Sequence, residues 1–232
     1  MDIDDFSLEP QKEELLLEIP NISTSISLIK PEDPSCNAVA LTPSAVKYLI
    51  EQNIRVFVQY GFSANSPYSD SDYADAGAEF VDKFPDLAIL GKIIIKFDSF
   101  TEEQLIVVPQ EKIIFSTKLP NNLSIEYIKI LNSKRIVSFA GVLLKDAIGE
   151  SLVDKIISES LSDLGFNVAL SSLLLPIVET LVHSPNIPYA LQKNMHLIQG
   201  IYTYKAWLCS QIIAEKLNLQ WRDILSLCWD LN

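Results

Sequence analysis

The sequence predicts an α/β protein with a flavodoxin-like, doubly wound parallel sheet and an added helical C-terminal segment. Two observations lead to this fold class. Short β-prone runs alternate with helical segments up to about Phe139, and such alternation is typical of a parallel sheet with helices on both faces. The run Ile93–Phe97 (IIIKF) is apolar except for one lysine, as expected for a strand that is buried on both faces.

Local signals place five strands and the helices that connect them. The strands are expected at Ser25–Ile29, Arg55–Gln59, Ile93–Phe97, Ile113–Ser116 and Ile136–Phe139. Helices are expected at Gln11–Glu18, from Pro43, from Asp70 to Ala78, from Thr101 and at Ile125–Leu131. Thr42 is a good N-cap, Pro43 suits the first helical position, and Ser124 can cap the later helix. These capping residues predict where each helix begins more clearly than where it ends.

The chain after Gly141 is almost entirely compatible with helix. Helices are expected from Leu143 to Val182, with interruptions near Gly165 and at Pro176, and at Lys205–Leu217 and Trp221–Leu227. The stretch Leu173–Leu181 is more apolar than a helix with one buried face requires, so we expect it in the core or at a subunit interface. We therefore expect an α/β domain over residues 1–141, bridging helices over 142–189, and C-terminal helices over 190–232 that pack back on the first domain.

The charge of the chain argues against several classes of partner. Its 30 acidic and 18 basic residues give a formal net charge of −12, which repels nucleic acid and anionic membranes. No uninterrupted apolar run approaches the roughly 20 residues of a membrane span. The acidic start MDIDDFSLEPQKEE has no basic region like that of a signal peptide. The expected location is the cytoplasm, and no nucleic-acid or membrane partner is expected.

The sequence contains no pattern typical of a metal site. The scattered cysteines form no CxxC pair and have no neighbouring histidine; they are Cys36, Cys209 and Cys228. His183 and His196 are interpreted as structural or solvent-exposed, because neither has a nucleophile at a motif spacing. A cation site at Asp70, Asp72 and Asp75 is the alternative to helix capping, which we favour. No metal is expected.

Two separated stretches resemble one known family. The first begins at Val39, reads VALTPSAVKYLIEQNIRVFVQYGFSANSPYSDSDYADAGAEFVD, and continues to IIIK, which ends at Lys96. The second, from Ala190 to Ile224, reads ALQKNMHLIQGIYTYKAWLCSQIIAEKLNLQWRDI. They resemble the N-terminal domain and the closing segment of alanine dehydrogenases and of the transhydrogenase alpha subunit. Because both stretches match in the correct order, the chain is identified as a shortened member of this family.

The resemblance implies an NAD-binding Rossmann domain between the two stretches, but the sequence has little room for one. Only the residues from Gly141 to Ala190 lie there, and they read as helix. No two of the seven glycines are spaced as GxG, which the phosphate-binding turn of a dinucleotide site requires. We therefore predict that the chain lacks the NAD-binding domain and binds no cofactor.

The resemblance also implies substrate residues that this sequence has lost. The position of the carboxylate-clamping arginine is Ala38, and the second lysine of the strand-end motif aligns with Asp98. Lys96 matches the first lysine, and no histidine follows the strand near Phe115. No catalytic residue is therefore assigned. A residual ligand pocket is predicted from Ala38, Lys96, Asp98 and Lys118. The alternative is that Lys96 is a structural lysine paired with Asp98 or Glu102.

These losses predict a protein that is not an enzyme by itself. The first hypothesis is a non-catalytic interaction or regulatory subunit, a pseudoenzyme that forms a homodimer or pairs with a full-length alanine dehydrogenase. The second is an oxidoreductase component whose nucleotide domain is supplied by a partner chain. The third is a sensor of small metabolites, for which Ala38 and Asp98 disfavour carboxylate ligands and favour neutral or cationic ones.

Overall fold

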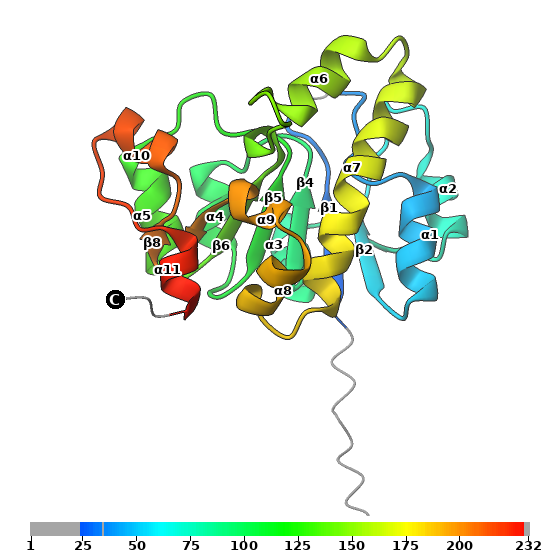
Figure 1. The fold of residues 1–232 in the computed structure, drawn as a ribbon. Helices are drawn as coiled ribbons and strands as arrows, with labels where there is room; N and C mark the ends of the chain where they lie inside the picture. Colours follow the sequence, from blue (N-terminus) through cyan, green and yellow to red (C-terminus); the bar gives the residue numbers. More distant parts are fainter. Residues whose placement is uncertain (1–23, 34, 230–232) are drawn as a thin grey trace, which may run out of the picture.

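The computed structural model describes residues 24–33 and 35–229, which form an eight-stranded sheet between two layers of helices (Figure 1). The helix expected at Gln11–Glu18 lies outside the described residues. The strands are β1 (Ser25–Ile29), β2 (Arg55–Gln59), β3 (Glu79–Val81), β4 (Ile93–Lys96), β5 (Ile113–Ser116), β6 (Val137–Ala140), β7 (Ile201–Tyr204) and β8 (Trp207–Leu208). Their spatial order is β3-β2-β1-β4-β5-β6-β7-β8.

The doubly wound parallel sheet predicted from the sequence is confirmed. The five expected strands are β1, β2, β4, β5 and β6, and they lie in the order β2-β1-β4-β5-β6, which is the flavodoxin-like order. The strand β3 was not predicted, and it extends the sheet beyond β2 as a parallel edge strand of three residues. The helix between β3 and β4 was also not predicted; it begins at Phe84 with Pro85 in its first turn.

Helices cover both faces of the sheet. They are α1 (Pro43–Glu51), α2 (Asp70–Asp75), α3 (Phe84–Leu90), α4 (Glu102–Val107), α5 (Ile125–Ser133), α6 (Leu152–Glu159), α7 (Asp163–His183), α8 (Ile187–Lys193), α9 (His196–Gly200), α10 (Gln211–Leu217) and α11 (Ile224–Trp229), with a short 3₁₀ turn at Gly141–Leu143. One core cluster contains buried side chains of α3, α4, α5 and α10, and a second contains those of α1, α7, α8, α9 and α11. The two clusters lie on opposite faces of the sheet, so the molecule has three layers.

The helix starts follow the predicted capping residues, with one correction. Thr42 Oγ1 accepts the backbone N–H of Ala45 at 3.4 Å, and Ser124 Oγ accepts that of Tyr127 at 2.9 Å. The cap of α2 is Ser69, which forms a capping box with Asp72. Asp70 instead accepts hydrogen bonds from the backbone of Gly61 and, at 2.7 Å, from the side chain of Ser63. It thus holds the loop after β2.

The helix α7 is continuous through Gly165 and Pro176, where the sequence predicted interruptions. A proline inside a helix frees the carbonyl four residues earlier, here that of Ser172, which is exposed and can be hydrated. By length and composition α7 could cross a membrane, but 44% of its most apolar window is buried inside the protein. Its buried Asn167 accepts the backbone N–H of Val39 at 2.7 Å and donates to the carbonyl of Asn37 at 3.0 Å. The buried face of α7 is therefore part of the core.

The C-terminal part contains a β-hairpin where helix was expected. The predicted helix at Lys205–Leu217 is wrong in its first half, because β7 and β8 pair antiparallel and α10 begins only at Gln211. Lys205 and Ala206 form the two-residue turn with φ of 49° and 64°, a type I′ geometry that suits hairpins. At the end of α9, a Cβ on Gly200 would lie 2.0 Å from the ring of Phe139, so this position requires glycine.

Candidate functional site

The topological switch point of the sheet lies between β1 and β4. The helix that follows β1 covers one face of the sheet, and the helix that follows β4 covers the other. In doubly wound sheets this arrangement opens a crevice at the carboxyl ends of the two strands, where ligands bind. Residues 30–33 and 35–41 of the loop after β1 and the segment Phe97–Thr101 after β4 form the edge of this crevice.

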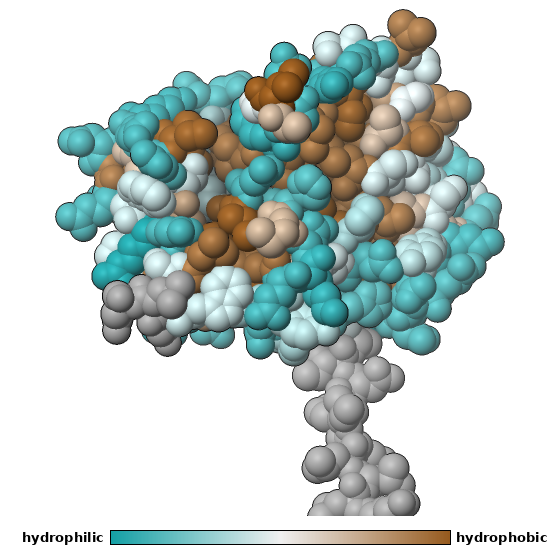
Figure 2. Space-filling view, in the orientation of Figure 1, coloured by the Kyte–Doolittle hydropathy of each residue, from teal (hydrophilic) through white to brown (hydrophobic). Residues whose placement is uncertain are grey.

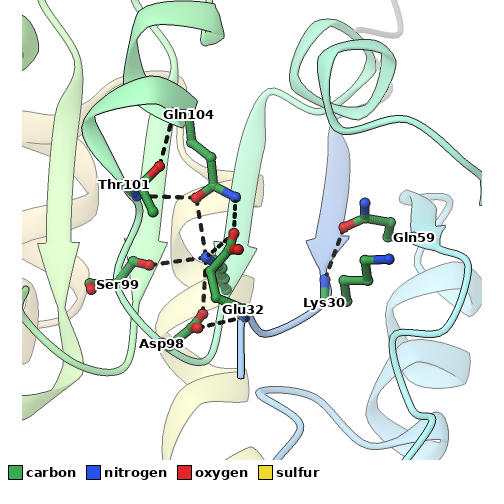
Figure 3. A network of polar contacts seen from close by, with 8 residues as sticks. Lys30, Glu32, Gln59, Asp98, Ser99, Thr101 and Gln104 are labelled. Atoms are coloured by element: carbon green, nitrogen blue, oxygen red, sulfur yellow. Dashed lines mark hydrogen bonds and ion pairs between the residues drawn. The ribbon is translucent and has the colours of Figure 1, made fainter. Parts of the chain in front are cut away.

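A closed polar network centred on Lys96 occupies part of the switch point. The Lys96 side chain is fully buried, and its Nζ lies 3.1 Å from Glu32 Oε1 and 3.2 Å from Asp98 Oδ1. The same ammonium donates to the Gln104 side-chain carbonyl and to the Ser99 backbone carbonyl, each at 3.1 Å. Figure 3 shows Glu32, Asp98 and Gln104 converging from the two loops and from α4. All three protons of the ammonium therefore have acceptors.

The side-chain acceptors of Lys96 are themselves held by further hydrogen bonds. Asp98 Oδ2 accepts the backbone N–H of Glu32 at 2.7 Å, and the Gln104 amide donates to Glu32 Oε1 at 2.6 Å (Figure 3). Gln104 also takes part in the capping box of α4, since its side chain accepts the backbone N–H of Thr101 at 3.2 Å. Two carboxylates thus face one ammonium, so the network carries one net negative charge and leaves no free cation at the end of β4.

Two cavities flank this network. The Gln59 cavity, of about 360 Å³, lies between the loops after β1 and β2, and Lys30, Asp33, Gln59 and Gln104 line it. Inside it the Gln59 amide is engaged, because its oxygen accepts the backbone N–H of Lys30 at 3.2 Å. The Phe97 cavity, of about 410 Å³, lies between the loop after β1 and the corner of α6 and α7. Both volumes are in the range of small-molecule sites.

The four residues predicted for a residual pocket fall into two groups. Ala38 and Lys118 line the Phe97 cavity, with Ala38 almost wholly buried. Lys96 and Asp98 pair with each other in the closed network, as the structural alternative for Lys96 proposed, whereas Glu102 instead accepts the hydroxyl proton of Ser124. The network does not include Lys118, whose ammonium lies 5.0 Å from the centroid of the Phe97 ring.

Glu32 and Gln104 were not predicted as site residues from the sequence. Glu32 follows the first expected strand, in the run PEDPSC, for which no helix, strand or site residue was predicted. Gln104 was one residue of an expected helix start, and its position three residues after Thr101 is the capping-box spacing. That spacing could have identified Gln104, but nothing local to Glu32 points to Lys96, 64 residues away.

The environment of the Cys36 thiol disfavours its reactive thiolate form. Burial raises the pKa of the Cys36 thiol, and the nearby carboxylates of Asp98 and Asp33 raise it further. The His183 ring is 3.0 Å from the Glu179 carbonyl of its own helix, far along α7 from the switch point. Among the residues that the structure describes, no group of three metal-ligating side chains is found.

Comparison with known proteins gives one family and a set of similar folds. The family described as alanine dehydrogenase/PNT, N-terminal domain, matches residues 30–153, which is more than half of the chain. An L-alanine dehydrogenase structure is similar at a TM-score of 0.52 with 19% identity, covering 58% of this chain and 37% of that one. A transhydrogenase structure from Sinorhizobium meliloti has a TM-score of 0.48 with 21% identity, covering 58% of this chain and 39% of that one.

This chain spans well under half the length of the two dehydrogenase-type structures. At these identities the structural likeness establishes the fold alone. No curated protein matches the chain.

Proposed function

Since the chain belongs to the alanine dehydrogenase/PNT N-terminal domain family, we propose that it works as a non-catalytic interaction or regulatory subunit. The observation that carries this proposal is the closed network at Lys96. A site for a carboxylate substrate needs an accessible cation. Here the strand-end ammonium is fully buried and already holds two carboxylates, Glu32 and Asp98. At the Lys96 network, an incoming carboxylate would meet a net negative charge in place of a clamp.

The segment between β6 and β7 supports the same proposal. It consists of the 3₁₀ turn and helices α6 to α9, and it returns directly to the sheet at Ile201. A dinucleotide-binding unit needs a βα turn with bare backbone at its glycines. The glycines of this segment are Gly141, Gly149, Gly165 and Gly200, and Gly165 lies inside α7. Buried side chains of this segment belong to the core, which supports the proposal that it does not hold a pyrophosphate.

An apolar surface on α6 and α7 supports self-association. We call it the α7 face; its exposed members are Ile157, Leu161, Leu164 and Val168, with Leu161 fully exposed. Figure 2 shows apolar side chains gathered over this part of the molecule. Residues 164–178 contain no charged side chain. Each copy carries a formal net charge of −12, so two copies repel each other. Association through an uncharged apolar surface has the lowest electrostatic cost.

The proposed partner is therefore a second copy of this chain. Light scattering of the purified protein is expected to give the mass of a dimer, and the double variant Leu164→Glu, Val168→Glu is expected to give a monomer. Ile89→Glu serves as the matched control, because Ile89 is also an exposed apolar helix residue but belongs to α3 on the other face of the sheet. A monomeric wild type, or a dimer that survives the double variant, would refute the α7 face as the interface.

The catalytic part of the proposal is tested by activity and cofactor binding. Alanine oxidation with NAD and pyruvate amination with NADH are both expected to stay at the level of buffer. Calorimetry is expected to detect no NADH binding. Turnover by the purified chain, or a micromolar Kd for NADH, would overturn the proposal.

A second candidate function is an oxidoreductase component completed by a partner chain. The two cavities at the switch point favour it, because they lie where ligands of doubly wound sheets bind. Mixing the chain with full-length alanine dehydrogenase subunits and assaying alanine and pyruvate turnover separates the two candidates. Turnover above that of the added subunit alone would support this candidate, and an unchanged rate with every subunit tried would refute it.

A further inference from the structure

A second lysine at the same edge of the sheet is held very differently from Lys96. Lys118 follows β5, and its exposed side chain crosses to the ring of Phe97, where the ammonium lies 5.0 Å from the ring centroid. An ammonium over an aromatic face is attracted by the negative face of the ring. The chain thus places one of its own ammonium groups in the Phe97 cavity, against an aromatic surface.

The aromatic surface in this cavity is preorganised. The Phe97 side chain is 6% exposed, and the Phe166 ring of α7 meets it edge-on, with centroids 6.0 Å apart and an interplanar angle of 88°. The hydrogen bonds of Asn167 to the backbone of Val39 and Asn37 fix this turn of α7 against the loop after β1. Helix and loop therefore form a wall that does not need to rearrange when a ligand enters.

The charged residues that line the cavity favour a cation. They are Asp33, Lys118 and Asp163, so two carboxylates stand against one ammonium. Hydrogen bonds from Ser35 lower the pKa of Asp33, which therefore stays ionised throughout the physiological range. With Lys118 drawn onto the Phe97 ring, the cavity offers acceptors but no second cation. The formal net charge of −12 also attracts small cations from solution.

We propose that the Phe97 cavity binds a small organic cation whose ammonium group takes the place of the Lys118 ammonium on the Phe97 ring. The cavity volume of about 410 Å³ fits a molecule of metabolite size. Asp33 and Asp163 provide the countercharge. Ile157, Leu161 and Phe166 provide apolar contact for the carbon skeleton. Lys118 acts as an internal competitor that leaves toward solvent when the ligand binds.

This proposal goes beyond the interaction role, and its site is built within one chain. Ile157 and Leu161 line the Phe97 cavity and also belong to the α7 face, so self-association through that face would compete with ligand entry. The titrations are therefore made on the monomeric α7-face variant as well as on the wild type, because Leu164 and Val168 do not line the cavity. Failure of self-association would leave the cavity free to bind the amine. Failure of amine binding would leave the dimer mass and the lack of turnover unchanged.

The test uses three probes that share one skeleton and differ in charge: benzylammonium, benzyl alcohol and benzoate. Calorimetric titration of the full chain at low ionic strength is expected to give the highest affinity for benzylammonium and no detectable binding of benzoate. Lys118→Met should raise the affinity for benzylammonium roughly threefold to tenfold, because the competing ammonium is gone. Asp163→Asn and Phe97→Leu should each lower it by a similar factor.

Lys129→Met is the matched control, because Lys129 is an exposed lysine on α5 outside this cavity. It is expected to leave all three titrations unchanged. An anion site would give the opposite signs: benzoate would bind best, and Lys118→Met would abolish its binding. That result, or the absence of benzylammonium binding to both the wild type and Lys118→Met, would overturn the proposal. Asp163→Asn keeps the test informative even if Phe97→Leu fails to fold.

Discussion

The Lys96 network and the Phe97 cavity lie side by side at the carboxyl edge of one sheet, yet they offer opposite chemistry. Lys96 is fully buried and holds two carboxylates, a side-chain amide and a backbone carbonyl. Lys118 is exposed and rests on one aromatic ring. The first lysine has become part of the structure, and the second can be displaced. The position of a lysine at a strand end therefore does not indicate a ligand site until its partners are known.

The largest expected effect comes from removing the closed lysine. Lys96→Met leaves the carboxylates of Glu32 and Asp98 without their cation, and we expect a loss of about 2–4 kcal/mol in the free energy of unfolding. Lys118→Met removes a single exposed contact and should cost at most about 0.5–1 kcal/mol. Urea unfolding of both variants measures the difference. Equal losses would mean that the two lysines do not differ as described.

A smaller effect is expected at the wall that the two regions share. Asn167→Ala removes both hydrogen bonds between α7 and the loop after β1, and we expect it to cost about 1–3 kcal/mol because the freed backbone N–H of Val39 is buried. Ser172→Ala, on the exposed side of the same helix, is the control and should be nearly neutral. If the two variants unfold at the same urea concentration, the two hydrogen bonds of the Asn167 side chain contribute nothing to stability.

A third lysine, Lys134, is held in a way that is intermediate between Lys96, which is paired with carboxylates, and Lys118, which contacts only an aromatic ring. Lys134 donates to the backbone carbonyls of Leu105, Ile106 and Val108 and so caps the end of α4 without any carboxylate. Lys134→Met should cost about 1 kcal/mol, a value between those of the other two lysines. Thermal unfolding of the three methionine variants in one buffer gives the order. A Lys134 effect as large as that of Lys96 would show that carbonyls alone stabilise a lysine as well as carboxylates do.

The smallest effect concerns pH. Hydrogen bonds from Ser35 lower the pKa of Asp33 below its ordinary value of 3.8. A carboxyl with a lowered pKa in the folded state stabilises the protein above its unfolded pKa, and this contribution is lost as the pH falls through the folded value. The Tm difference between wild type and Asp33→Asn should therefore be present at neutral pH and shrink below about pH 3.8. Ser35→Ala should show the same trend; a difference that grows in acid would contradict it.

Much of the fold followed from the sequence because its strands are apolar runs with clear helix starts between them. The strand β3 was not predicted because it has only three residues and borders the solvent. The hairpin of β7 and β8 was not predicted because its turn consists of Lys205 and Ala206, without the glycine or asparagine that usually marks such turns. In both cases tertiary pairing outweighed the local signal.

The candidate site was less predictable than the fold. The strand-end position of Lys96 followed from the apolar run before it. Whether its ammonium is paired or free depends on Glu32, which comes from a different loop. The Phe97 cavity depends on α7 folding back over the loop after β1 through Asn167. Neither contact leaves a periodic pattern in the sequence, because each joins residues that are distant along the chain.

The central claim, that the Lys96 edge is closed to carboxylates, can be tested by NMR of the lysine ammonium groups, with Lys96→Arg used to assign the signal. The buried, fully hydrogen-bonded ammonium of Lys96 should give a slowly exchanging signal that does not move when pyruvate is added. A shift or loss of that signal on titration with pyruvate would show that the strand-end cation still binds a keto acid, and would contradict the account.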